Sequence, residues 1–168
     1  MYIALFGQMK KQLGQLDTWF DAAHAAAATR KFDANQFLTS RLAPDQFPLT
    51  RQVQITCDTA KRGAAFLAGT EAPSHPDTEQ TIDELRTRIR WTADFLGSFT
   101  PAQMADAATR VVTQPRWEGK VMSGADYFVE HVVPNFYFHL SHCYAILRHG
   151  GVPLGKRDYL GALSQKLP

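Results

Sequence analysis

Histidine and amide side chains recur at helical spacing in the last third of the sequence. The set is His131, Asn135, His139 and His142, separated by four, four and three residues. On an unbroken helix these side chains would share one face, with neighbouring Cβ atoms about 5–6 Å apart. Imidazoles one turn apart can converge on one ion while a facing helix supplies another ligand, so the spacing suits a divalent metal. The segment is also rich in aromatic residues, where a histidine can serve as a hydrogen-bonded core residue, and both interpretations stay open.

Three polar residues in an earlier segment offer partners for the histidines. Arg51, Gln54 and Asp58 follow one another at spacings of three and four. If their helix face lies against the histidine-bearing helix, the two faces would line one pocket. On a solvated face the same residues would form only a surface ion pair. Nucleophilic triads, phosphate-binding glycine loops and paired-carboxylate sites are absent from the sequence in recognisable form, so the candidate pocket depends on these two segments.

Apolar residues at spacings of three and four predict the helices that would position this pocket. The predicted helices run from near the start of the chain to about residue 29, and over 48–69, 82–96 and 127–149. Asp77 or Thr78 is the predicted cap of the third helix. Pro134 predicts a kink or a fresh start in the fourth helix around residues 132–135. The pattern therefore predicts an all-α four-helix bundle.

The segments between the predicted helices indicate loops with two small additions. Residues 33–48 contain turn-forming and helix-breaking residues and predict a long connection, and prolines predict a loop over 71–77. Thr100, followed by proline and then by Gln103, predicts a short extra helix. Residues 110–122 are compatible with a small hairpin or an extended excursion before the last helix.

Composition predicts one folded domain spanning residues 1–168, with 45% hydrophobic and 20% charged residues. The formal charge is only +2 and the basic residues are scattered, which argues against nucleic acid as a partner. The sequence shows neither a signal-peptide pattern nor an apolar stretch long enough to span a membrane. We therefore expect a cytoplasmic protein with no membrane partner.

The two cysteines, Cys57 and Cys143, lie in apolar segments predicted to be helical, and their positions show no paired-ligand spacing. Both are predicted to be small buried residues. A regulatory domain that responds through a thiol needs an exposed cysteine with a low pKa, so the sequence disfavours that function.

Four stretches of the sequence carry a resemblance to a known superfamily. They are RLAPDQFPL at 41–49, RQVQITCD at 51–58, PNFYFH at 134–139 and AILRHGGVPLGK at 145–156. In these stretches the chain resembles the DinB-like, or YfiT-like, metalloenzyme superfamily, in a branch described only as a domain of unknown function. The resemblance implies a bundle with up-down-down-up connections and a homodimer. Metal-binding members take three histidines, one from the second helix and an HxxxH pair from the fourth.

The resemblance also indicates which residues of this chain would stand at the metal-binding positions. Asn135 and His139 correspond to the HxxxH pair, and Gln54 or Asp58 corresponds to the histidine of the second helix. Because asparagine is a weak ligand for zinc or nickel, His142 would have to supply the second imidazole. The predicted metal set is therefore His139, His142 and Asp58, binding one divalent ion such as zinc or nickel.

Two classes of function follow from these alternatives. With a metal, the protein would be a divergent hydrolase or thiol transferase whose ion lowers the pKa of a bound water or thiol. Without a metal, it would be a non-catalytic bundle that binds a small ligand or serves as an oligomeric interaction module. In that case Gln54, Asp58, Asn135 and His139 would form a buried hydrogen-bond network, with Arg51 beside it.

Overall fold

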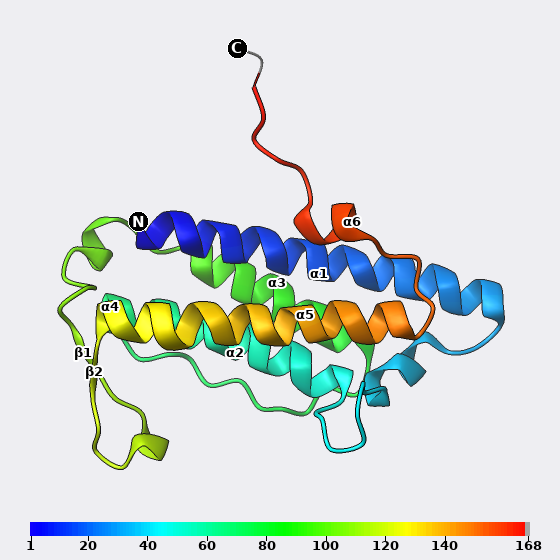
Figure 1. The fold of residues 1–168 in the computed structure, drawn as a ribbon, viewed down its shortest axis with the longest axis horizontal. Helices are drawn as coiled ribbons and strands as arrows, with labels where there is room; N and C mark the ends of the chain where they lie inside the picture. The colour runs from blue at the N-terminus through cyan, green and yellow to red at the C-terminus, as the bar shows by residue number, and fades with distance from the viewer. Residues whose placement is uncertain (167–168) are drawn as a thin grey trace.

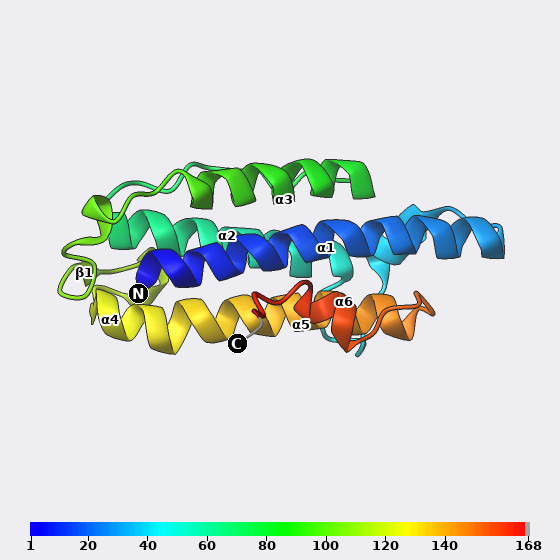
Figure 2. The ribbon, with the colours of Figure 1, turned by 90° about the horizontal axis from the view of Figure 1, so that it is seen from above.

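Four long helices form the body of the protein, and the computed structural model describes residues 1–166 (Figure 1). They are α1 (Tyr2–Arg30), α2 (Leu49–Ala68), α3 (Ile82–Gly97) and α5 (Val133–His149). Seen from above in Figure 2, α3 and α5 lie on opposite sides of α1 and α2. The predicted all-α four-helix bundle is confirmed. Within residues 1–166, no helix is both long and apolar enough to cross a membrane.

The helices follow the up-down-down-up order that the resemblance implies. Arg86, near the start of α3, forms an ion pair with Asp21, late in α1, with 2.7 Å between Nη1 and Oδ1, so these helices are antiparallel. Figure 1 shows α2 and α3 running in the same direction and α5 returning in the direction of α1. The connection between the parallel helices, residues 69–81, therefore crosses the length of the bundle, and we call it the crossover segment.

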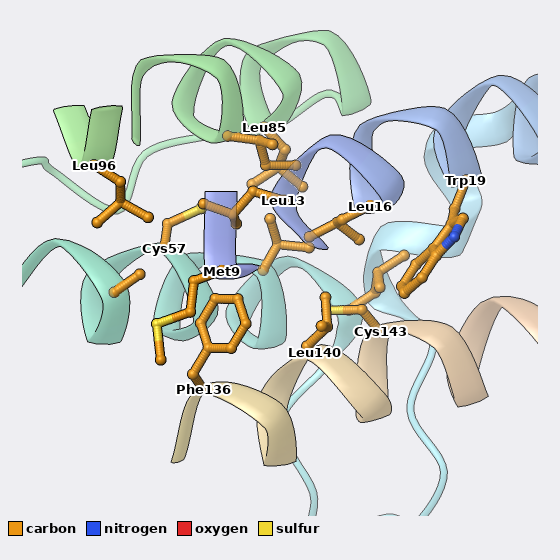
Figure 3. Packing of buried hydrophobic residues seen from close by; sticks show 14 of the residues in the cluster. Met9, Leu13, Leu16, Trp19, Cys57, Leu85, Leu96, Phe136, Leu140 and Cys143 are labelled. Atoms are coloured by element: carbon orange, nitrogen blue, oxygen red, sulfur yellow. The ribbon is translucent and has the colours of Figure 1, made fainter. Parts of the chain in front are cut away.

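Apolar side chains from the helices meet along the centre of the bundle. Figure 3 shows Leu13 and Leu16 of α1 between Leu85 of α3 and Leu140 of α5, and all four are 0% exposed. Burying one such side chain contributes about 1.5–3 kcal/mol to folding. Both cysteines lie in this core, as predicted, and burial raises the pKa of the Cys57 thiol to about 12.

The ends of the helices show which capping signals were interpreted correctly. Gly69 ends α2 in the left-handed conformation with φ 72°, which confirms the predicted boundary. The predicted cap of α3, Asp77 or Thr78, is wrong. Thr81 caps α3 instead, because its side chain accepts from the Glu84 backbone N–H while the Glu84 carboxylate accepts from the Thr81 N–H.

Short elements complete the connections. They are the 3₁₀ helices η1 (Ala34–Thr39), η2 (Ala102–Met104) and η3 (Pro115–Trp117), the strands β1 (Val111–Val112) and β2 (Met122–Ser123), and the helices α4 (Gly124–Asp126) and α6 (Lys156–Leu160). Strands β1 and β2 pair antiparallel, so the predicted small hairpin is confirmed, and η2 is the predicted short helix. Helix η1 lies inside the connection that was predicted only as a loop.

A π-helix, η4 (Tyr127–Val132), leads directly into α5. Pro134 has no N–H, and in an ordinary α-helix its ring would clash with the carbonyl four residues earlier. The wider i→i+5 turn removes that conflict without breaking the helix. The predicted disturbance at Pro134 thus takes the form of a π-helical segment, and such segments occur often at functional sites.

Close approach between α2 and η4 depends on a glycine. A Cβ placed on Gly63 of α2 would lie 2.7 Å from Cγ1 of Val132, whose side chain is fully buried. Gly63 therefore sets the spacing between the two helices that flank the candidate site.

Candidate functional site

A cavity of about 340 Å³ lies between α2 and the continuous η4–α5 helix, and we call it the α2–α5 cavity. Helix α2 contributes a stripe of side chains at helical spacing, and the crossover segment and the β1–β2 hairpin close two of its edges. The lining residues are Phe47, Arg51, Ile55, Asp58, Thr59, Arg62, Asp77, Gln114, Arg116, Tyr127, His131, Asn135 and His139.

The structure brings four of the predicted pocket residues together, namely Arg51, Asp58, Asn135 and His139. Gln54 is 4% exposed and lies outside the cavity, where its amide nitrogen donates to Glu79 Oε2 at 2.9 Å. Its Oε1 accepts from Arg51 Nη1 at 3.2 Å, so Gln54 lies beside the cavity lining, on the side of α2 that faces the crossover segment.

His142 also lies outside the α2–α5 cavity. Its Nδ1 is 2.7 Å from the Phe138 carbonyl, and its Nε2 is 3.3 Å from the side-chain nitrogen of Gln46. Three residues turn an α-helix by about 300°, so His142 is offset by about 60° from the face that His139 occupies.

His139 is fixed by a buried hydrogen bond to α2. Its Nδ1 is 2.7 Å from Gln52 Oε1, and the Gln52 amide nitrogen donates to the Phe47 carbonyl at 3.1 Å. Burial, and next the neighbouring charges of His142 and Arg51, lower the pKa of His139 to about 4. At neutral pH this imidazole is therefore uncharged.

Asp58 belongs to a set of charges that tie α2 to α3 and to the crossover segment. The set, which we call the α2–α3 charge network, comprises Asp58, Lys61, Asp77, Glu79 and Arg88. Asp58 Oδ1 is 2.8 Å from Lys61 Nζ and 2.8 Å from Arg88 Nη2. Burial opposes ionisation of Asp58, but the hydrogen bond from Lys61 and the charge of Arg88 lower its pKa below the usual value.

Arg88 is the centre of this network, and its side chain is only 2% exposed. Its Nη1 lies 2.9 Å from Asp77 Oδ1 and 2.9 Å from Glu79 Oε1. Asp77 also pairs with Arg51 at the edge of the cavity. Each carboxylate of the network therefore has at least one cationic partner.

The donor set does not fit the metal site that the resemblance implies. Within residues 1–166, no three His, Cys, Asp or Glu side chains are placed to hold one ion. His139, His142 and Asp58 each use ring or carboxylate atoms in other contacts, and Asp58 is already shared by Lys61 and Arg88. A divalent cation at Asp58 would also have to overcome repulsion from these neighbouring cations.

The end of the cavity near the hairpin is lined by an arginine and stacked aromatic rings instead of paired charges. Arg116 of η3 places Nη2 2.6 Å from Nε2 of His131, which must accept because the guanidinium only donates. Burial, and next the charge of Arg116, lower the pKa of His131. Its ring stacks on Tyr127 at 5.4 Å, and Trp117 packs edge-on against both rings, so Trp117 anchors the hairpin here.

Positive charge exceeds negative charge around the α2–α5 cavity. Among the lining residues, Arg51, Arg62 and Arg116 face only Asp58 and Asp77, which leaves a net charge of +1. Arg116 forms no ion pair with any carboxylate of residues 1–166. Arg62 is 53% exposed, and its Nη2 lies 3.6 Å from the already shared Asp58. The cavity therefore favours a negatively charged occupant.

Sequence reasoning missed several of these residues. Arg62 follows Asp58 by four residues and extends the stripe from Arg51, so the spacing held a usable signal. Thr59 is the neighbour of a predicted residue, whereas Gln114 and Arg116 reach the cavity through a hairpin whose direction no local pattern encodes.

Comparisons with known proteins agree on one family. The family model described as Domain of unknown function (DUF1993) matches residues 1–160. The solved structure of a DinB family member protein from Shewanella denitrificans shares 50% sequence identity with a TM-score of 0.93, over 97% of this chain and 93% of that chain. The curated proteins contain no match to this chain.

Proposed function

The chain belongs to the DUF1993 family of DinB-like proteins, and we propose that it is a metal-free bundle that binds a small anion in the α2–α5 cavity. The observation that carries the proposal is the excess of guanidinium groups at the hairpin end. Arg116 donates to a neutral histidine and has no carboxylate partner in residues 1–166. Arg62 has only a 3.6 Å contact to Asp58 Oδ2, on a carboxylate whose other oxygen pairs with Lys61 and Arg88.

A carboxylate or phosphate is the natural partner for such a pair of arginines. Guanidinium groups present several N–H donors in a planar arrangement that matches both kinds of anion. Charge-assisted hydrogen bonds of this type contribute more than neutral ones, especially where water is partly excluded. The cavity volume, about 340 Å³, lies at the small end of the range of small-molecule sites, so it suits a ligand of few heavy atoms.

Thermal unfolding with inorganic phosphate, pyrophosphate and acetate tests this function. Each titration is run at pH 7 and constant ionic strength, with sodium chloride as the reference, because a specific ligand raises the Tm through mass action. We expect at least one anion to raise the Tm above the chloride reference. Arg116→Ala should weaken that binding about tenfold.

Arg157→Ala is the matched control. Arg157 is likewise exposed, but it lies on α6 and does not line the cavity. We expect this variant to bind the anion like the unmodified protein. The absence of any Tm rise, or an equal loss of binding in both variants, would contradict the proposal.

The metal-dependent hydrolase or thiol transferase remains a prediction and has its own test. The protein is purified without a histidine tag, supplied with zinc, nickel, manganese or iron, and assayed for metal per chain beside His139→Ala. One equivalent of bound metal that is lost in the variant would favour the metalloenzyme over the metal-free bundle.

A further inference from the structure

The α5 side of the α2–α5 cavity is lined by two side chains that each keep a polar acceptor atom with no partner among the described residues. They are His139 and Asn135, one turn apart on α5. Their hydrogen bonds to α2 determine which atoms are left for an occupant. These atoms specify a chemical feature of the ligand beyond its charge.

The tautomer of His139 follows from its neighbours. The Gln52 amide nitrogen donates to the Phe47 carbonyl at 3.1 Å, so Gln52 Oε1 is the atom that faces His139. A carbonyl oxygen only accepts, and therefore His139 Nδ1, at 2.7 Å, carries the proton. In the neutral ring Nε2 then has a lone pair and no hydrogen. It has no hydrogen-bond partner within residues 1–166.

The amide of Asn135 also bonds α2 through one of its two ends. Its Nδ2 donates to Thr59 Oγ1 at 2.6 Å. The amide oxygen Oδ1 has no partner among the described residues. The cavity therefore offers cationic donors at the hairpin end. Along α5 it offers two neutral acceptors and the second N–H of Asn135 Nδ2, a combination that a hydroxyl group, which both donates and accepts, can satisfy.

We propose that the ligand is a small hydroxylated anion, in which a carboxylate or phosphate contacts Arg116 and Arg62 and one or two hydroxyl groups donate to His139 Nε2 and Asn135 Oδ1. The inference rests on the proposed function, because it specifies the ligand of the same cavity. A hydroxyl fits better than an ammonium group, since the surrounding charge is net positive and would repel a cation. An unsubstituted alkyl chain would leave both acceptors without a partner.

Isothermal titration with a matched pair of ligands tests this inference on the unmodified protein. Glycerol 3-phosphate and n-propyl phosphate share a phosphate head and a three-carbon chain, but only the first has free hydroxyl groups. We expect glycerol 3-phosphate to bind about tenfold more tightly, as one to two neutral hydrogen bonds would give. The pair 3-hydroxybutyrate and butyrate repeats the comparison with a carboxylate head and identifies the preferred anion.

Asn135→Leu assigns the effect to a residue. Leucine has the same branching at Cγ and no acceptor, so the tenfold preference should fall to about threefold or less. The ratio of the two affinities is the readout, because a general loss of structure would weaken both ligands together.

The outcomes separate the inference from the function on which it rests. Equal affinities within both pairs, with binding still weakened by Arg116→Ala, would overturn the hydroxyl preference and leave anion binding standing. No binding of any of the four ligands, together with no Tm rise from the simple anions, would overturn both.

Discussion

The two sides of α2 hold charge in opposite ways. Toward α3, Asp58 and Glu79 contact Lys61 or Arg88 at 2.8–2.9 Å, and the carboxylates of this side are all paired. Toward η4 and α5, Arg116 has no carboxylate partner in residues 1–166, His131 accepts its hydrogen bond, and burial lowers the pKa of His139 to about 4. A closed network holds helices together, whereas an open set of donors and acceptors can accept a ligand. Neighbouring positions on one helix thus differ in role according to the partner they face.

The largest expected effect is on stability, and it comes from removing the central cation of the α2–α3 charge network. Arg88→Met removes the cation that Asp58, Asp77 and Glu79 share, and it leaves buried carboxylates without their main partner. We expect a loss of about 3–5 kcal/mol in the free energy of unfolding, measured by urea denaturation. The control, Arg90→Met, removes a side chain that is 60% exposed and should cost less than about 1 kcal/mol. Similar losses for both variants would show that the network is not the stabilising unit.

A substitution at Gly63 would change the spacing between α2 and η4, which flank the cavity. In Gly63→Ala the new Cβ would lie 2.7 Å from Val132 Cγ1, so α2 and η4 must move apart or Val132 must shift. We expect a loss of about 1–3 kcal/mol in the free energy of unfolding. Gly14→Ala on α1 has no heavy atom within 4 Å and should instead stabilise the protein by up to about 1 kcal/mol. If both substitutions stabilise, close packing at Gly63 is not required.

Acid should weaken the open side through His139. The pKa of His139 is about 4 in the folded protein and 6.5 for an unperturbed histidine, as in the unfolded chain. Between these two pH values the unfolded chain therefore binds a proton that the folded protein does not. Stability is therefore retained above about pH 6.5 and falls as the pH decreases toward 4. We expect this residue to account for about 2 kcal/mol between pH 7.5 and pH 5. Denaturation at both pH values should show a smaller difference for His139→Gln, and an unchanged difference would remove His139 as the cause.

The smallest effect should come from removing the negative charge of Asp77, which contacts both the charge network and the cavity. Asp77 neutralises Arg51 at the cavity edge, so Asp77→Asn would leave Arg51 free to attract the anion. We expect phosphate to bind about threefold more tightly. Asp94→Asn, at a side chain 85% exposed and paired with Lys10, is the control and should leave binding unchanged. Weaker binding in Asp77→Asn would indicate that Asp77 orients the arginine rather than competing for it.

Local signals predicted the bundle because they act over a few residues. The stripe from Leu85 to Leu96 marked α3, and Gly69 marked the end of α2. The wrong cap of α3 has a physical explanation. Aspartate is a common capping residue, but the carboxylate of Asp77 forms ion pairs with Arg51 and Arg88 instead. Arg88 itself lies three residues after Leu85, on the apolar face, and this position was a readable sign of a buried ion pair.

The candidate site was less predictable, because it depends on where whole elements lie. Spacing correctly grouped Asn135 with His139, but it also included His142, which faces Gln46 instead. Arg116 gave no signal, since its distance from His131 depends on the packing of Trp117. The tautomer of His139 depends on hydrogen bonds that link its ring to the Gln52 amide and the Phe47 carbonyl, and no sequence pattern indicates these contacts.

The hairpin that carries Arg116 is short. Its strands have only two residues each, and Trp117 attaches it to η4. In the proposed function, exchanges between residues 115 and 121 would change the group that faces the anion, while the buried residues Val112 and Gln114 stay in place. A ligand preference set in this way would be changeable through one short segment, apart from the four helices that hold the core.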